Sequence, residues 1–131
     1  IGISQGHHEL SHHQNDATSL DRIAQIDRWE IGMLAGLLSR MKNIDMGTHT
    51  LLDETTVYFS SEIEDGNRHY HYNLPIVLAG RSGGLTNGRS LDVSGSEANN
   101  QPVANLFMRI AQDAGVSINS FGDDGTQALN I

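Results

Sequence analysis

The feature that most constrains the fold is a short apolar run, Leu74-Pro-Ile-Val-Leu-Ala79. From Ile76 to Ala79 the run has no polar face, and a strand with two apolar faces must be covered on both sides. Pro75 lacks a backbone N–H donor, so it should lie at the beginning of the strand. The run therefore predicts a buried strand inside a layered α/β fold.

Three further elements surround this strand. The segment Thr55–Ser60 is β-branched and aromatic, which indicates a second strand, and we expect it to run parallel to the first in one sheet. A long helix should span Leu20–Lys42 and cover that sheet, because its apolar residues recur at helical spacing. They are Leu20, Ile23, Ile26, Leu34, Leu37, Leu38 and Met41.

The second helix should run from Pro102 to Ala114, with Pro102 in the first turn and Gly115 as the C-cap. Its predicted buried stripe consists of Val103, Leu106, Phe107 and Ile110. The order helix, strand, strand, helix favours an α/β layer arrangement.

The ends and connections have their own signals. Thr18 and Asp21 have the spacing of a capping box, and Asp16 is the alternative N-cap of the long helix. Residues 1–16 are expected to form a loop, and Gly80–Gly88 a glycine-rich turn. A short strand near residues 89–93 and a polar loop over residues 94–101 complete the prediction.

Composition limits the class of protein. A chain of 131 residues corresponds to one domain, residues 1–131. Its net charge of −8 argues against a nucleic-acid partner and against an anionic membrane surface. No apolar run reaches the ~18–20 residues of a membrane span. There is no cysteine, so a metal would need His, Asp, Glu, Asn or water as ligands. The chain begins with Ile, and we expect it to be the C-terminal part of a longer protein.

Histidine is concentrated in two short segments, residues 7–13 and 69–71, which contain six of the seven histidines. His8 and His12 are four apart, so on a helical turn they would share a face and could bind one metal ion. His12 and His13 are adjacent and should point apart. The alternative is a polar surface loop with incidental histidines.

The second segment is preceded by acidic and amide side chains: Glu62, Asp65 and Asn67 come just before His69 and His71. In an extended segment, His69 and His71 would point to the same side. These residues follow the first predicted strand, and ligands of open α/β sheets bind at the carboxyl ends of strands. The alternative is a solvated loop whose carboxylates cap local turns. We expect the two histidine segments to be neighbours in space and to share one metal ion.

The string His8-x-x-Ser11-His12-His13, followed by Gln14-Asn15-Asp16, resembles the signature of the bacterial HXXSHH family, whose uncharacterised members are typically longer and expected to be exported. The resemblance covers nearly the whole chain. It continues through Thr50-Leu51-Leu52-Asp53, Asp65-Gly66-Asn67-x-His69-x-His71-x-Asn73-Leu74-Pro75, Leu78-Ala79-Gly80, Ala104-Asn105-Leu106 and Ser120-Phe121-Gly122-Asp123.

That family is similar to the alkaline phosphatase and sulfatase superfamily of metal-dependent hydrolases. The resemblance implies a three-layer α/β/α fold, of which this chain is the C-terminal portion. His8 stands where the superfamily usually has Asp, and Glu62 is not followed by His. The nucleophilic Ser or Thr belongs to the superfamily's N-terminal half and has no counterpart here.

The resulting expectation is a divalent-metal site, with zinc first, in a phosphatase- or sulfatase-like hydrolase that is incomplete and inactive as this chain alone. The metal ligands would come from His8, His12, Glu62, Asp65, His69 and His71, and His13 would serve as acid or base. The substrate would be a small anionic ester. The chain would be exported or periplasmic, and would associate with its N-terminal part or with itself. The alternative is a non-catalytic exported binding or structural domain.

Overall fold

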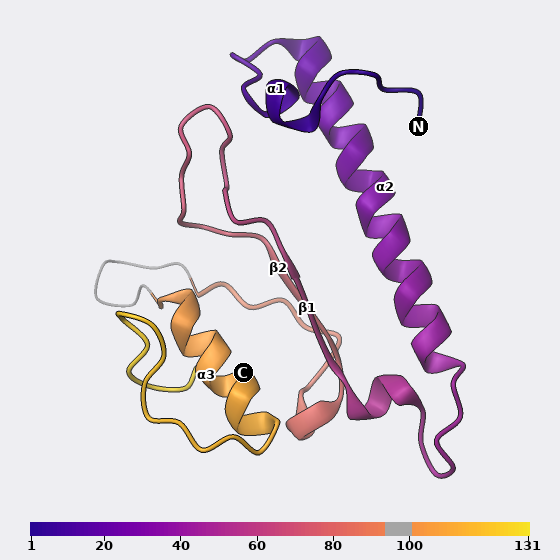
Figure 1. The fold of residues 1–131 in the computed structure, drawn as a ribbon, viewed down its shortest axis with the longest axis vertical. Helices are drawn as coiled ribbons and strands as arrows, with labels where there is room; N and C mark the ends of the chain where they lie inside the picture. Colours follow the sequence, from indigo (N-terminus) through magenta and orange to yellow (C-terminus); the bar gives the residue numbers. More distant parts are fainter. Residues whose placement is uncertain (94–100) are drawn as a thin grey trace. The chain divides into compact units, whose positions relative to one another are not determined.

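The computed structural model describes residues 1–93 and 101–131. The chain divides into two compact units, each with its own contacts. Unit 1 comprises Ile1–Ile44 and Tyr58–Val77, and unit 2 comprises Asp45–Val57 and Leu78–Ile131. The mixture of helices with a small sheet confirms the α/β class at this level (Figure 1). None of the described helices is long and apolar enough to cross a membrane.

Unit 1 begins with two helices. The short helix α1 (His7–Ser11) lies within the segment that we expected to be a loop, and it packs against α2 (Ala17–Lys42). Leu10 of α1 is almost fully buried, with 1% of its surface exposed. The predicted capping box at Thr18 is wrong, because Asp16 is the N-cap and its carboxylate accepts a hydrogen bond from Ser19 N at 2.8 Å. Arg40 and Lys42 lie in the last turn of α2, where the helix dipole favours cations.

The sheet is a two-stranded antiparallel hairpin of β1 (Thr56–Ser60) and β2 (Ile76–Gly80). Its direction follows from both ends: Ser60 Oγ donates to the carbonyl of Pro75 at 3.0 Å, and Gly80 lies against the carbonyl of Thr55. The predicted parallel pairing is therefore wrong. Parallel strands need a long crossover, usually a helix, whereas residues 61–75 are polar and rich in turns. The residues predicted for a sheet rim instead lie in the hairpin loop.

Strand β2 also departs from the expected burial on both faces, since Val77 is exposed. An apolar run therefore does not by itself show that both faces of a strand are covered by other elements. Pro75 does directly precede the strand, as predicted.

Unit 2 is built around α3 (Val103–Asp113), which has Pro102 as its N-cap and Ala114 as its C-cap. Its buried residues differ from the predicted stripe: Val103 is exposed, and Phe107 and Ile110 are only half-buried. The buried positions are Ala104, Asn105, Leu106 and Met108. The reason is that the C-terminal tail folds back on a second side of the helix, so the buried face is wider than one stripe.

Asn105 organises that tail. Its Oδ1 accepts hydrogen bonds from the backbone N–H groups of Thr126 and Gln127 at 3.1 and 3.3 Å, and its carbonyl accepts from Leu129 N at 3.0 Å. Its Nδ2 donates to Gln101 Oε1 at 3.0 Å. A buried amide must have such partners, because an unsatisfied one costs about 1–3 kcal/mol. Asn105 thus fixes the tail whose order the sequence left open.

The remaining parts of unit 2 are turns. The 3-10 helix η1 (Leu51–Glu54) precedes β1, and η2 (Ser82–Gly84) contacts α3. This confirms the glycine-rich turn after β2. No strand forms over residues 89–93, so that prediction is wrong: Leu91 and Val93 alternate with polar residues, but both side chains are exposed. The loop predicted for residues 94–101 lies outside the described residues except for Gln101.

Candidate functional site

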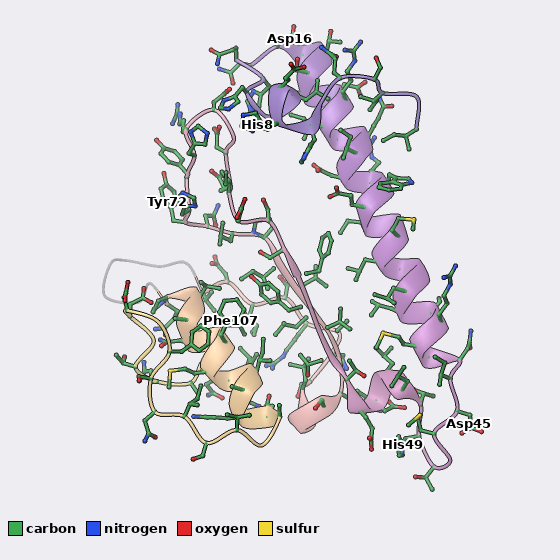
Figure 2. The ribbon with its side chains drawn as sticks, viewed as in Figure 1. His8, Asp16, Asp45, His49, Tyr72 and Phe107 are labelled. Atoms are coloured by element: carbon green, nitrogen blue, oxygen red, sulfur yellow. The ribbon has the colours of Figure 1, made fainter. Side chains whose placement is uncertain are left out.

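The two histidine segments meet in unit 1, as predicted. The imidazole of His12 lies between those of His8 and His69, with ring centroids 4.8 Å and 5.0 Å away. Both contacts are edge-to-face, with interplanar angles of 82° and 67°. His8 and Asp16 lie at the end of unit 1 where α1 meets the start of α2 (Figure 2). Three rings from segments 57 positions apart (12 to 69) therefore form one cluster, which we call the imidazole cluster.

Helix α1 explains the first pair. His8 lies on this helix and His12 is its C-cap, so the spacing of four places both rings on one side, as predicted. Ser11 lies between them, but its hydroxyl donates to the carbonyl of His8 at 2.8 Å. That bond is internal to the helical turn, so the geometry gives Ser11 a structural role.

Glycine allows the second segment to approach α1. A Cβ atom added to Gly66 would overlap the carbonyl oxygen and the Cβ of Ser11. The backbone of the hairpin loop therefore lies directly against the end of α1. The sequence Asp65-Gly66-Asn67 signals a turn, but nothing in it shows that the glycine is needed for contact with another segment.

Asn67 ties the two segments together. Its Oδ1 accepts a hydrogen bond from Gln14 N at 3.0 Å, and its Nδ2 lies 3.2 Å from His13 Nδ1. Our sequence interpretation counted Asn67 among the polar residues of the loop but gave it no role. Its function as a link depends on where Gln14 and His13 lie, and residue type alone carries no such signal.

The backbone of this region adopts conformations that are costly for residues with a side chain. Gln14, Asn15 and His69 have φ values of 47°, 62° and 53°, in the left-handed region. Such positions cost of order 1–3 kcal/mol each and cluster at functional sites. Gln14 and Asn15 are the central residues of a tight turn closed by Asp16 N and His13 O at 2.7 Å. Gln14 and Asn15 thus lie beside the imidazole cluster, and His69 is a member of it.

The two carboxylates proposed as ligands differ in their surroundings. Asp65 Oδ1 accepts hydrogen bonds from Asn67 N at 2.8 Å and Arg68 N at 3.3 Å, so this carboxylate holds its own turn. Glu62 is exposed, and its carbonyl contacts His71 Nδ1 at 3.0 Å. The imidazole cluster thus contains His8, His12 and His69, whereas His13, His71 and Asp65 bond to groups around it.

Aromatic side chains stiffen the hairpin loop. The rings of Tyr70 and Tyr72 are stacked with centroids 4.7 Å apart, and the Arg68 guanidinium lies 5.5 Å from the centre of the Tyr70 ring. Desolvation, followed by the hydrogen bond with Tyr70, raises the pKa of Tyr72 above its usual value near 10. Because its pKa is raised, the phenol of Tyr72 remains neutral in ordinary buffers, although more than half of this side chain is exposed.

The separation of the rings suits a shared metal. With a Zn–N bond of ~2.0–2.1 Å, a ring centre lies roughly 3.2 Å from the metal, and two tetrahedral ligands have ring centres about 5 Å apart. The observed 4.8 and 5.0 Å match this spacing. The orientation of the rings is a separate matter. Across the described residues no group of three or more His, Asp or Glu side chains could hold a metal as they stand. Rotation of the imidazoles would be needed.

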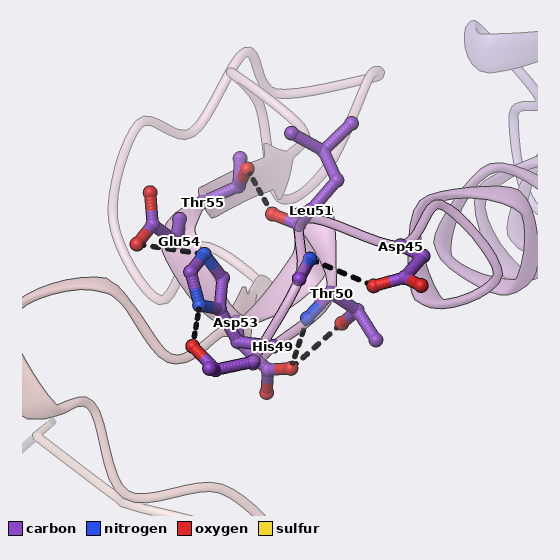
Figure 3. A network of polar contacts seen from close by, with 9 residues as sticks. Asp45, His49, Thr50, Leu51, Asp53, Glu54 and Thr55 are labelled. Carbon is purple, nitrogen blue, oxygen red and sulfur yellow. Dashed lines mark hydrogen bonds and ion pairs between the residues drawn. The ribbon is translucent and has the colours of Figure 1, made fainter.

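The seventh histidine, His49, lies in unit 2 and takes part in a different kind of network (Figure 3). His49 Nε2 pairs with Glu54 Oε1 at 2.9 Å, and its Nδ1 lies 3.0 Å from the hydroxyl of Thr48. Nearby, Asp53 Oδ2 accepts from both the backbone N and the hydroxyl of Thr50. These bonds close the turn before β1. Thr48 is adjacent to His49, and adjacency does not make a catalytic pair.

Comparison with protein-family models, with curated proteins and with solved structures finds no match for this chain.

Proposed function

We propose that His8, His12 and His69 are the nitrogen ligands of a divalent-metal site, with zinc as the first candidate. The observation that carries this proposal is the placement of His12 at ligand spacing from two other imidazoles. Three histidines leave the fourth position of a tetrahedral metal open, which is typical of catalytic and not structural zinc. His71, Glu62 and Asp65 are the nearby groups that could add a ligand or orient one.

We further propose that this site belongs to a hydrolase similar to metal-dependent phosphatases and sulfatases, acting on a small anionic ester. The support is the resemblance of the residue strings to the HXXSHH family. When bound, the metal would polarise an ester oxygen and activate a nucleophile. The nucleophile, the remaining strands of a three-layer α/β/α fold, and export from the cell are all parts of this proposal that depend on sequence outside this chain.

A non-catalytic binding or structural domain is the second candidate. It is favoured by the direct edge-to-face contacts of the three rings, which stabilise neutral aromatic groups without any ligand. In that case the imidazole cluster would be a packing feature of unit 1.

Zinc titration by calorimetry separates the candidates. We expect one equivalent to bind, and His12→Ala to lower the affinity by more than about 100-fold, since losing even an outer-shell partner costs 10–100-fold. Affinity should also fall below about pH 6, because ligand imidazoles must be neutral. His49→Ala is the matched control, as its ring is held by Glu54 in unit 2. Equal affinity of wild type and His12→Ala would overturn the metal proposal.

A further inference from the structure

The two histidines beside the imidazole cluster contact backbone groups that fix the position of the ring proton. A backbone N–H can only donate a hydrogen bond, and a backbone carbonyl can only accept one. A ring nitrogen that meets an N–H must therefore carry a lone pair, and one that meets a carbonyl must carry a proton. His13 and His71 meet opposite partners.

His13 meets a donor. The backbone N–H of Asn15 points at His13 Nδ1 over 3.1 Å. The amide of Asn67 lies beside the same ring: its Oδ1 is occupied by Gln14 N–H, and its Nδ2 is 3.2 Å from Nδ1 and 3.5 Å from Nε2. Because Nδ2 is almost equally far from both ring nitrogens, only the hydrogen bond from Asn15 assigns the proton. The proton of His13 belongs on Nε2.

His71 meets an acceptor. Its Nδ1 lies 3.0 Å from the carbonyl oxygen of Glu62, within the same hairpin loop. The proton therefore belongs on Nδ1, and Nε2 carries the lone pair. This arrangement is the one found in most metal-binding histidines, which donate the other ring N–H to a carboxylate or a backbone carbonyl.

We propose that unit 1 holds His13 and His71 in opposite neutral tautomers. His13 presents an Nε2–H donor, so through Nε2 it can give a hydrogen bond but cannot act as a base or a metal ligand. His71 presents a bare Nε2, so it is the base or the additional ligand. The division of roles rests on the proposed function, whereas the tautomers are properties of the metal-free chain.

The consequence for the site is specific. The sequence predicted His13 as acid or base without distinction. The hydrogen bond from Asn15 leaves Nε2 of His13 only the donor role, and Asn67 lies against the same ring.

The test is a two-bond proton–nitrogen correlation spectrum of the full chain labelled with ¹⁵N-histidine. It is recorded without metal at about pH 8, above the ~6.5 at which free imidazole titrates. We expect the Nε2–H pattern for His13 and the Nδ1–H pattern for His71. The second result is the more decisive, because free histidine prefers the Nε2–H form. His7, an exposed residue at the start of α1, is the internal reference.

A pair of variants tests Asn67. Asn67→Asp replaces the amide donor by an acceptor and should move His13 toward the Nδ1–H or doubly protonated form, leaving His71 unchanged. Asn73→Asp makes the same charge change in the same loop and should leave both rings unchanged. A wild-type His71 that matches His7, or a His13 protonated at Nδ1, would overturn the assignment. If both tautomers are as assigned but zinc does not bind, the metal proposal alone fails.

Discussion

Units 1 and 2 hold their non-helical segments in different ways. In unit 2 the described left-handed positions are all glycines, such as Gly47, Gly80 and Gly115, and the tail is fixed by a buried asparagine. In unit 1 four residues with side chains, Gln14, Asn15, His69 and Asn73, occupy left-handed positions. Gln14 and Asn15 lie beside the imidazole cluster, and His69 belongs to it.

The two units place different residues at left-handed positions. Glycine takes a left-handed conformation at little cost, so the turns of unit 2 are built from the residue that suits them. Unit 1 keeps costlier conformations and offsets them with side-chain bonds from Asn67 and His13. Strain of this kind persists only where the surroundings over-determine it. In unit 1 it is concentrated around the imidazole cluster, where the metal site is proposed.

The largest expected effect concerns a glycine of unit 2. Gly80→Ala should destabilise the chain by about 2–5 kcal/mol, which combines left-handed strain with overpacking. The new Cβ would overlap the carbonyl oxygen of Thr55, at a φ of 109°. Urea denaturation followed by circular dichroism measures the change.

Gly88→Ala is the control for this substitution. Gly88 also has a positive φ, 76°, but nothing lies within 4 Å of its added Cβ. Its cost should be strain alone, about 1–2 kcal/mol. If the two variants were equally stable, the close packing at Gly80 would have no energetic role, and the contrast between the units would lose one of its supports.

Local patterns predicted the elements well and their arrangement poorly. The periodic helix at Leu20–Lys42 and the β-branched Thr55–Ser60 are within a few residues of α2 and β1. The direction of pairing was missed, because an apolar run does not say whether its partner is parallel. The spacing of His8 and His12 predicted that both rings lie on one face of a helical turn. The proximity of His69 to this pair was also predicted. The roles of Asn67 and Gly66 depend on contacts across more than 50 positions, which no single-sequence pattern contains.

The next effect has the opposite sign and belongs to unit 1. Gln14→Gly should stabilise the chain by up to about 1 kcal/mol, because glycine adopts the left-handed conformation at little cost. The substitution keeps the backbone N–H that donates a hydrogen bond to Asn67 Oδ1. Urea denaturation measures the change in stability.

Gln25→Gly makes the same substitution inside α2 and should cost about 1 kcal/mol instead. A destabilising Gln14→Gly would show that this turn is not strained. The cost assigned to the left-handed conformation of Gln14 would then be absent.

The smallest expected effect is electrostatic and should be shared by both units. Backbone and then side-chain hydrogen bonds from Ser19 lower the pKa of Asp16 in unit 1, and those from Thr50 do the same for Asp53 in unit 2. A folded pKa below the unfolded value of 3.8 means that the ionised form favours folding, so the contribution is fully present above 3.8 and is lost as the pH falls from there through the lower, folded pKa. Asp16→Asn and Asp53→Asn remove the titration but keep the side-chain shape. The difference in unfolding free energy between wild type and each variant should therefore be positive near pH 6 and shrink toward about pH 3. Urea denaturation at several pH values measures it.

The contradicting outcome is a difference that stays constant, or grows on acidification, for Asp53→Asn but not for Asp16→Asn. The turn before β1 would then not depend on an ionised Asp53, and stabilisation by an ionised capping carboxylate would be confined to unit 1.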